Sequence, residues 1–345
     1  MNLEQIKEKL ISPEYDFLRT NEHLGNNIIL LTLGGSHAYG MDKETSDLDV
    51  RGIALNPKSD ILLGTDFEQV VNTDTDTTMY SFNKMIQLLT SSNPNTIEIL
   101  GCKPEHYLHL SDIGKELLDH KKMFLSKICI HTFAGYAGAQ LRRLENKSAR
   151  LVGQAENELH IYKSICNAKY DFKRRYYPHD DNNVKLYVDE SMQPDYETEI
   201  FMDIDLKGYP LRDWVGMWNE MKAIVSSYGK IGKRNEKAIS HDKLGKHMAH
   251  LMRLYMMCID ILEKKEIITY RTDEHDLLMQ IRNADPLFLD NNRQPTKAFY
   301  DLLNDYEKRF EYAKQNTSLP DVPDYKSINE FKMYVNERIV RGNVT

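Results

Sequence analysis

The sequence predicts an α+β protein, in which a small mixed β-sheet domain with helices on one face is followed by a mainly helical domain. Between residues 27 and 104, stretches typical of strands alternate with helix-like stretches. From residue 112 onward, apolar residues recur mainly with helical spacing. The chain of 345 residues is long enough for two domains, which we place at 1–110 and 111–345.

The elements of the first domain follow from its composition. Residues 1–10 are charged and amphipathic, unlike a secretory signal, and residues 1–26 are expected to form a helix and a loop. The apolar run 27–33 predicts a strand, which a Gly-Ser turn and a short helical link connect to a second strand around 47–50. The stretch 70–80 is rich in Thr, Val and Tyr and predicts another strand. A helix is predicted over 82–90.

The second domain is predicted to be helical with one extended insertion. Seven segments have helical apolar spacing: 133–144, 159–170, 211–226, 244–264, 274–282, 296–313 and 327–341. The segments 184–188 and 196–204 read as extended, so we expect a hairpin or irregular insertion at about 176–210.

Two acidic residues, Asp47 and Asp49, stand on the second predicted strand with one residue between them. Side chains alternate along a strand, so the two carboxylates point the same way while Leu48 and Val50 point into a core. Neighbouring carboxylates repel each other unless a cation lies between them. Hard oxygen ligands of this kind suit Mg²⁺ or Mn²⁺.

A Gly-Ser turn at Gly34, Gly35 and Ser36 lies eleven positions before Asp47, counted from Ser36. Such a turn offers backbone N–H groups and a hydroxyl, which together can bind phosphate. Alone, either motif is commonly a plain turn or a solvated strand edge. In combination, they indicate a site that handles a nucleoside triphosphate (NTP).

The motifs Gly-Ser-His-Ala-Tyr-Gly (35–40) and Ser-Asp-Leu-Asp-Val-Arg-Gly (46–52) resemble those of the DNA polymerase β-type nucleotidyltransferase superfamily. The closest resemblance is to its predicted-nucleotidyltransferase branch of bacteria and phages, some members of which are linked to RNA repair. Further similar stretches are 76–84, 93–100, 246–254 and 277–283. The resemblance is specific over about 28–104, moderate over about 235–285 and poor between them.

The resemblance implies nucleotidyl transfer with an NTP as substrate and two Mg²⁺ or Mn²⁺ ions as cofactors. Asp47 and Asp49 would hold the metal that binds the triphosphate. Asp49 and Asp76 would hold a second metal, which lowers the pKa of the attacking hydroxyl. Gly35 and Ser36 would bind the β- and γ-phosphates.

The third acid is a choice between two residues of the predicted strand 70–80. Asp74 and Asp76 would share a face of that strand. The family pattern favours Asp76, which lies four residues before Tyr80, and Asp74 is the alternative ligand. Both acids could instead be solvated on an exposed strand.

Three basic residues complete the predicted nucleotide-binding set. Arg51 faces the same side as Asp47 and Asp49, where it would contact phosphate or pair with a metal ligand. Lys84 lies near the solvent side of its predicted helix and would contact phosphate or base, or be a plain surface lysine. Arg253 could reach a triphosphate from its predicted helix.

Two further residues near the motifs have open roles. Glu98 would either cap a helix start or join the site. Tyr39 would either stack on a base or pack beneath the Gly-Ser turn.

Composition is that of an ordinary soluble protein, with 41% hydrophobic and 28% charged residues and no apolar run long enough to cross a membrane. Four cysteines without metal-site spacing are expected to be reduced, which favours a cytoplasmic location. Acidic charge is concentrated in the first domain, where residues 1–110 hold 16 Asp and Glu against 8 Lys and Arg. Divalent metal would offset part of this excess.

Basic clusters at 142–150, 169–177 and 230–246, the second interleaved with aromatic residues, predict a groove for a nucleic-acid strand, although they could also be solvated helix faces. We therefore favour RNA or tRNA as the acceptor. The alternatives are a hydroxyl of a protein or small molecule, and a nucleotide-binding regulator without catalysis. Because all three acids are present, a regulator is the least favoured. The sequence predicts no particular oligomeric state.

Overall fold

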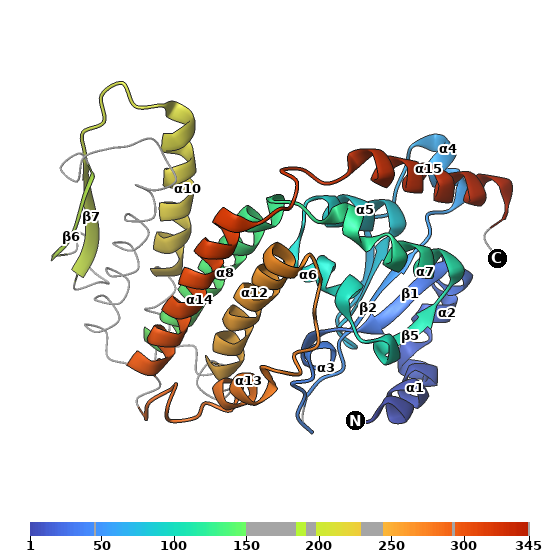
Figure 1. Ribbon diagram of the computed structural model, residues 1–345, viewed down its shortest axis with the longest axis horizontal. Coiled ribbons are helices and arrows are strands. Elements are labelled where there is room, and N and C mark those ends of the chain that lie inside the picture. The colour runs from blue at the N-terminus through green and yellow to red at the C-terminus, as the bar shows by residue number, and fades with distance from the viewer. Residues whose placement is uncertain (45, 150–183, 191–197, 229–243, 292–293, 344–345) are drawn as a thin grey trace. The chain divides into compact units, whose positions relative to one another are not determined.

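A computed structural model describes residues 1–44, 46–149, 184–190, 198–228, 244–291 and 294–343 of the protein (Figure 1). The chain divides into two compact units. Unit 1 comprises Met1–Ala137, Met252–Met279 and Leu303–Thr345, and unit 2 comprises Gly138–Leu251 and Gln280–Leu302. Unit 1 therefore includes segments from the C-terminal half, whereas the sequence led us to place all of 111–345 in one domain.

A five-stranded mixed sheet forms the centre of unit 1, which confirms the predicted α+β class. Its strands are β1 (Ile28–Leu33), β2 (Val50–Ala54), β3 (Gln69–Asn72), β4 (Thr77–Ser81) and β5 (Tyr107–Leu110), in the order β3-β4-β2-β1-β5. The β2–β4 pair is parallel and the other pairs are antiparallel. In the parallel pair Val50 lies opposite Thr77, so the starts of β2 and β4 are neighbours.

The prediction of a single strand over 70–80 is wrong, because this stretch is a hairpin. Strand β3 ends at Asn72, whose Oδ1 accepts hydrogen bonds from the N–H groups of Asp74 and Thr75, each at 3.1 Å. An Asn side chain bonded to the backbone two or three residues on is typical of a turn. Asp76 follows with a left-handed φ of 46°, and β4 begins at Thr77. Asp74 and Asp76 thus lie in a turn and not on one face of a strand.

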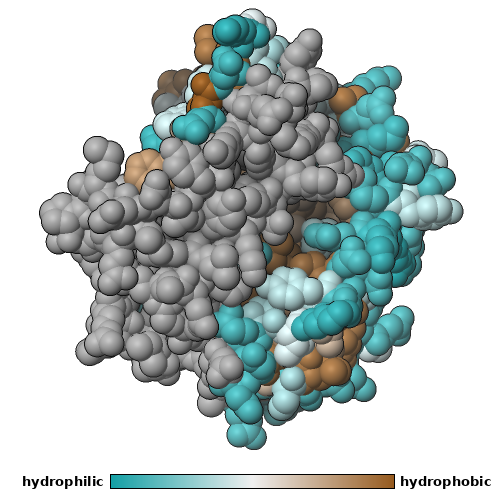
Figure 2. Space-filling view, turned by 90° about the vertical axis from the view of Figure 1, so that its left-hand side faces the viewer, coloured by the Kyte–Doolittle hydropathy of each residue, from teal (hydrophilic) through white to brown (hydrophobic). Residues whose placement is uncertain are grey.

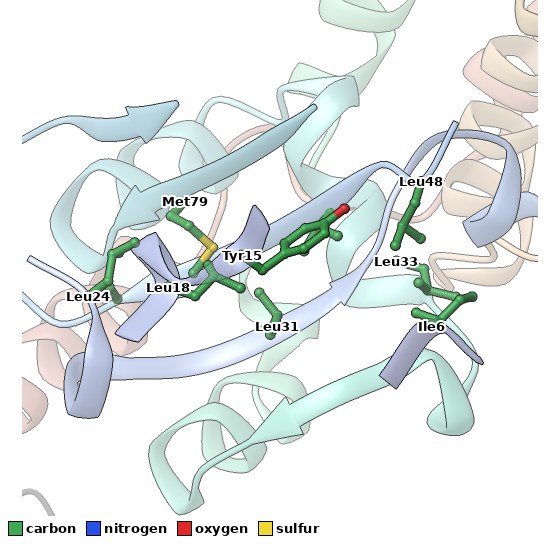
Figure 3. Packing of buried hydrophobic residues seen from close by; sticks show 10 residues of the cluster. Ile6, Tyr15, Leu18, Leu24, Leu31, Leu33, Leu48 and Met79 are labelled. Carbon is green, nitrogen blue, oxygen red and sulfur yellow. The ribbon is translucent and has the colours of Figure 1, made fainter. Parts of the chain in front are cut away.

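The N-terminal segment packs on one face of the sheet through helices α1 (Leu3–Ile11) and α2 (Phe17–Thr20). A capping box starts α1, in which Asn2 and Gln5 each bind the other's backbone N–H through their side chains. Ile6 of α1 and Leu31 of β1 belong to the resulting apolar cluster (Figure 3). Full burial of such a side chain contributes about 1.5–3 kcal/mol.

The opposite face of the sheet is also buried. Leu30 and Thr32 point away from the cluster of Leu31, yet both are fully inaccessible, as is Ile53 on β2. The shorter helices of unit 1 are α3 (Gly35–Tyr39), α4 (Lys58–Leu63), α5 (Phe82–Thr90), α6 (Pro94–Ile97) and α7 (Asp112–Asp119), and the 3₁₀ turns are η1 (Pro13–Tyr15), η2 (Gly25–Asn27), η3 (Glu98–Gly101), η4 (Pro104–His106) and η5 (Lys121–Phe124).

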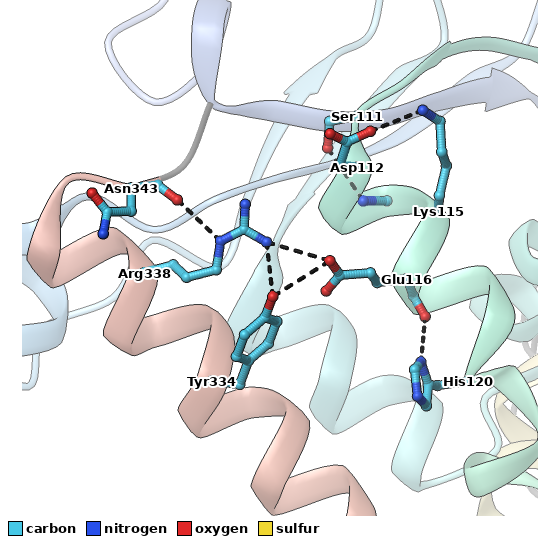
Figure 4. A network of polar contacts seen from close by, with 9 residues as sticks. Ser111, Asp112, Lys115, Glu116, His120, Tyr334, Arg338 and Asn343 are labelled. Atoms are coloured by element: carbon cyan, nitrogen blue, oxygen red, sulfur yellow. Dashed lines mark hydrogen bonds and ion pairs between the residues drawn. The ribbon is translucent and has the colours of Figure 1, made fainter.

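The last helix, α15 (Tyr325–Arg341), is held to α7 by polar contacts (Figure 4). Arg338 Nη1 lies 3.4 Å from Glu116 Oε1, and the Tyr334 hydroxyl donates to the same oxygen at 3.4 Å. Helix α15 begins at the cap residue Asp324 and ends at Gly342 in the left-handed conformation. The predicted helix over 327–341 is confirmed.

The remaining helices also match the sequence. They are α8 (Ile128–Ala149), α10 (Leu211–Tyr228), α12 (Leu244–Lys264), α13 (His275–Arg282) and α14 (Lys297–Asn316). The predicted insertion contains an antiparallel pair, β6 (Val184–Glu190) and β7 (Thr198–Ile204). The predicted helix over 159–170 lies outside the described residues. Figure 2 shows one side of the molecule, on whose coloured part hydrophobic and hydrophilic residues are interspersed.

Cys102, Cys129 and Cys258 are free thiols, as expected, and Cys166 lies outside the described residues. Within the described ranges, no helix combines the length and the apolar character that crossing a membrane requires.

Candidate active site

The Gly-Ser turn lies between strand β1 and helix α3, and its glycines are in contact with Asp49. The Gly34 N–H donates to the Asp49 carbonyl oxygen at 2.8 Å. Gly35 has a left-handed φ of 51°, and a Cβ placed on it would lie 1.7 Å from Asp49 Oδ2. Only glycine fits here, because a side chain would be strained by the backbone and would displace the carboxylate. The turn and the acid are therefore built against each other.

Ser36 is in the first turn of α3 and is 7% exposed. The first N–H groups of a helix have no acceptor within that helix, so this turn can offer them to an anion. Its far end is closed by a hydrogen bond from the Met41 N–H to the Ser36 carbonyl oxygen at 2.9 Å. The structure thus has the backbone turn that the sequence predicted at Gly35 and Ser36.

Asp47 and Asp49 lie just before β2 rather than within it, since regular pairing begins at Val50. The predicted alternation nevertheless holds. Asp47 is exposed and Asp49 is partly buried, whereas Leu48 and Val50 are 5% and 0% exposed. Both carboxylates are therefore on the side opposite the apolar core.

Asp76 is brought beside Asp49 by the parallel pairing of β2 and β4. The Val50 N–H donates to the Asp76 carbonyl oxygen at 3.3 Å, so the residue before β2 and the residue before β4 are neighbours. Asp74 is exposed two residues earlier in the turn. Of the two candidates for the third acid, Asp76 is thus the one that the fold places next to Asp49.

Arg51 joins the two acids. Its Nη2 lies 3.6 Å from Asp49 Oδ1 and 3.4 Å from Asp76 Oδ1, and its Nη1 donates to the Asp76 carbonyl oxygen at 2.6 Å. As expected, Arg51 faces the same side as the acids. Of its two predicted roles, the structure has the ion pair with the carboxylates.

The donor set suits a hard cation. Two carboxylates already approach one positive group within 3.6 Å, and Asp47 is two residues from Asp49 on the same side. In the described part of the chain, however, no three His, Cys, Asp or Glu side chains gather closely enough to form a metal site. The acids are adjacent, and Arg51 pairs with both of them.

A buried polar group lies on the other side of α3. The Tyr39 hydroxyl donates a hydrogen bond to Glu98 Oε2, and the Arg253 guanidinium carbon lies 3.4 Å from the centre of the Tyr39 ring. Tyr39 is 4% exposed and Arg253 is 9% exposed. Tyr39 therefore packs beneath the Gly-Ser turn, which is one of its two predicted roles. Glu98 is hydrogen-bonded to the Tyr39 hydroxyl.

Burial dominates the ionisation of this group. It raises the pKa of Glu98 above its ordinary value, against the opposing effects of the Arg253 charge, the Tyr39 hydrogen bond and the Arg51 charge. It also raises the pKa of Tyr39 well above its ordinary value, and the Glu98 carboxylate adds to this effect. The Tyr39 hydroxyl thus stays protonated and acts as a donor at neutral pH.

Lys84 is separated from the acids. It lies in the first turn of α5, after the C-terminal end of β4, and its Nζ is 2.8 Å from Glu68 Oε1. The acids lie before the N-terminal end of β4. With a rise of about 3.3 Å per residue, the five residues of this strand put roughly 15 Å between the two places.

The segment 269–271, which carries no recognisable motif, packs against the end of α3 and against Glu98. The Thr269 hydroxyl donates to the Glu98 carbonyl oxygen at 2.6 Å, and the Arg271 N–H donates to the Tyr39 carbonyl oxygen at 3.4 Å. The Tyr270 ring fills the place where Gly40 would carry a Cβ. Thr269 and Glu98 are 171 residues apart in the sequence, so no local spacing of residues could have revealed their contact.

A cavity of about 510 Å³ is present elsewhere in unit 1. Its lining includes Lys7, Arg19, Asn26, Ile28 and His109. Asn26 and Ile28 are at the start of β1, whereas the Gly-Ser turn follows its end, and none of the predicted site residues lines this cavity. The candidate site is therefore defined by the acids and the turn rather than by this cavity.

Two of the predicted basic clusters cannot be placed. The cluster 169–177 and nearly all of 230–246 lie outside the described residues. From 142–150, Arg142 and Arg143 lie on α8 with partly buried and exposed side chains, respectively. The predicted groove for a nucleic acid therefore stays a prediction.

The chain matches a protein-family model and a curated relative. The family model RlaP, described as the RNA repair pathway DNA polymerase beta family, matches residues 9–334. An uncharacterized 38.9 kDa protein of the nrdC–mobD intergenic region of Enterobacteria phage T4 is 26% identical over 130 residues. This alignment spans 34% of the chain and only 38% of the phage protein. No solved structure matches significantly.

Proposed function

Since the chain belongs to the RNA repair pathway DNA polymerase beta family, we propose that it is a metal-dependent nucleotidyltransferase acting on an RNA acceptor. The family match covers nearly the whole chain and confirms the resemblance read from the two motifs. The proposed reaction moves a nucleoside monophosphate from an NTP to an acceptor hydroxyl and releases pyrophosphate. The 3′ end of an RNA or tRNA is the proposed acceptor.

One observation supports this proposal most. Asp49 is in contact with the Gly35 backbone on one side and shares Arg51 with Asp76 on the other. The N–H groups proposed to bind phosphate and the carboxylates proposed to bind metal are therefore adjacent, as transfer of a phosphoryl group requires. A turn or an acidic strand edge with no function would not need this direct contact.

Each residue has a proposed part in the reaction. Asp47, Asp49 and Asp76 would hold Mg²⁺ or Mn²⁺, which when bound lowers the pKa of the attacking hydroxyl and offsets phosphate charge. Gly35 and Ser36 would orient the β- and γ-phosphates. The acceptor oxygen then bonds to the α-phosphorus as the bond to the pyrophosphate oxygen breaks.

Arg51 would change partner during this cycle. In the structure its guanidinium pairs with Asp49 and Asp76. With a cation on the acids, the guanidinium would turn to the triphosphate, which suits its planar array of donors. Both roles predicted from the sequence would thus belong to one side chain.

The test is transfer of label from each α-³²P-NTP, with Mg²⁺ or Mn²⁺, to RNA and to total cellular protein. Periodate-oxidised RNA, which lacks the terminal hydroxyls, is the matched acceptor, and Asp47→Ala/Asp49→Ala is the matched enzyme. We expect label in intact RNA alone, and none with the double variant.

The other outcomes assign other functions. Label in protein would replace the RNA acceptor by a hydroxyl side chain. Metal-dependent NTP binding without transfer to either polymer would contradict RNA transfer and favour a small-molecule acceptor or a regulator. Transfer that survives in the double variant would overturn the proposed site.

A further inference from the structure

We propose that Tyr39, Glu98 and Arg253 form a positioning network that fixes the Gly-Ser turn for the triphosphate, and that Arg253 acts through the Tyr39 ring rather than on the nucleotide. This inference rests on the proposed function and deepens it. It also revises the sequence-based prediction that Arg253 binds nucleotide directly. The network is defined by these three residues.

The network is attached to the phosphate-binding turn by covalent and hydrogen bonds. Tyr39 is the last residue of α3 and comes three residues after Ser36. Its hydroxyl is bound by Glu98, and its carbonyl oxygen accepts the N–H of Arg271 at 3.4 Å. Any shift of Tyr39 would therefore be passed along one helical turn to the N–H groups around Ser36.

The ring of Tyr39 cannot take the role of a stacking platform for a base. It is 4% exposed, and the guanidinium of Arg253 covers one face at 3.4 Å from the ring centre. Cation and ring at this distance attract each other, most strongly where water is excluded. Arg253 is itself only 9% exposed, so its charged group lies beneath the turn and in contact with the Tyr39 ring.

Glu98 is fixed in its turn from a distant part of the chain. The Thr269 hydroxyl donates to the Glu98 carbonyl oxygen at 2.6 Å, and the Thr269 N–H donates to Gly101 at 3.1 Å. Tyr270 lies against Gly40, where a Cβ would come within 2.4 Å of its ring. The segment 269–271 thus holds both Glu98 and the end of α3, so the turn has little freedom to move.

Binding of triphosphate and monophosphate distinguishes positioning from general stability. The turn is proposed to bind the β- and γ-phosphates. A displaced turn should therefore weaken the binding of the triphosphate and leave the binding of the monophosphate unchanged. Misplacement by about 1 Å can cost on the order of 10²-fold. We therefore measure dissociation constants, with Mg²⁺ present, for the four ribonucleoside triphosphates and their monophosphates.

The first variant is Tyr39→Phe, which keeps the ring and removes the hydroxyl. We expect NTP affinity to fall about 10–100-fold and monophosphate affinity to change less than about threefold, with the melting temperature measured alongside. Tyr334→Phe is the matched control, because it also removes a hydroxyl bound to a glutamate, Glu116, in the same unit. It should leave both affinities unchanged.

A double-mutant cycle tests the role of Arg253. If Arg253 acts through the ring, Tyr39→Leu/Arg253→Met should weaken NTP binding no more than the stronger single variant does. If Arg253 contacts the nucleotide, the two losses should multiply, and the proposal would be overturned. Arg253→Lys, which keeps a cation over the ring, should restore part of the affinity lost in Arg253→Met.

The two proposals fail in different ways. A wild-type protein that binds no NTP would overturn the proposed function and this inference together. If wild type binds NTP and Tyr39→Phe binds it equally tightly, only the positioning network would be overturned. Equal losses for triphosphate and monophosphate would also overturn it, because they would indicate a general structural effect.

Discussion

The polar contacts on the two sides of helix α3 differ in their exposure to water. On the side of β2 and β4, the side chains of Asp76 and Arg51 are 61% and 21% exposed, and their ion pair is open to water. Beneath the helix, Tyr39 and Arg253 are 4% and 9% exposed and share a contact with little access to water. The ion pair on the first side is accessible to water, whereas the contact on the second side is nearly inaccessible.

This difference in exposure separates the contacts proposed to take part in the reaction from the contacts that hold the backbone in place. Ion pairs in contact with water contribute little to stability, so acids there can give up an arginine for a metal or a phosphate at small cost. Buried polar contacts are costly to lose, so they hold a backbone in place. We expect the loss of a charge on the open side to reduce activity alone, and changes beneath the helix to affect both activity and stability.

The largest effect on activity is expected from Asp49→Asn. Loss of the charge that faces Gly35 and Arg51 should lower nucleotidyl transfer on the order of 10²–10³-fold, as for removal of other electrostatic groups in active sites. The free energy of unfolding should change by less than about 1 kcal/mol, because the ion pair is partly exposed. Urea unfolding and transfer assays measure the two quantities.

Asp119→Asn, at the exposed end of α7, is the control for Asp49→Asn. It should alter neither activity nor stability. If Asp49→Asn destabilised the protein as much as it slowed transfer, the open side would be structural, and the comparison would no longer hold.

The largest effect on stability is expected from Gly35→Ala, with Gly64→Ala as its match. Both glycines have left-handed φ, 51° and 68°, but a Cβ on Gly64 meets nothing within 4 Å. Gly64→Ala should therefore cost only the backbone term of about 1–2 kcal/mol. Gly35→Ala should cost about 1–3 kcal/mol more, because the methyl group overlaps the Asp49 carboxylate.

Denaturant unfolding of the two alanine variants measures this difference directly. Equal losses for Gly35→Ala and Gly64→Ala would show that Asp49 moves away freely. The close contact between turn and acid would then not be required.

The sequence predicts the arrangement of the acids and the Gly-Ser turn far better than it predicts the buried contacts beneath α3. The spacing between Ser36 and Asp47 and the alternation of Asp47 with Leu48 are local patterns, and both reappear in the structure. The hairpin within 70–80 was missed because Thr and Val favour strands on either side of a turn that depends on Asn72. Glu98 and Tyr39 are 59 residues apart, so only folding brings them together.

A smaller effect concerns pH and the buried side. Burial raises the pKa of Glu98 in the folded protein above its ordinary value of 4.5. Its proton therefore stabilises the fold fully below pH 4.5, and this contribution is lost as pH rises through the folded pKa. The stability of wild type relative to Glu98→Gln should thus increase as pH falls from 7 toward 4.5.

Thermal unfolding of both proteins at several pH values measures this trend. A relative stability of wild type that decreases on acidification would mean that Glu98 is stabilised as a carboxylate. The charge of Arg253 would then outweigh burial.

The smallest effect is expected from Lys84→Met. Lys84 pairs with Glu68, whose side chain is 71% exposed, so stability should fall by less than about 1 kcal/mol. Because Lys84 follows the far end of β4, NTP affinity should change less than twofold in an equilibrium titration. A tenfold loss would place the triphosphate toward α5 and away from the acids.

The most direct test of the central claim compares Asp76→Asn with Asp74→Asn in single-turnover transfer from α-³²P-NTP to RNA. The two acids belong to one turn, but only Asp76 shares Arg51 with Asp49. If the starts of β2 and β4 form the catalytic site, Asp76→Asn should slow transfer on the order of 10²-fold or more, and Asp74→Asn less than about threefold. A large loss in Asp74→Asn with little change in Asp76→Asn would contradict the site described here.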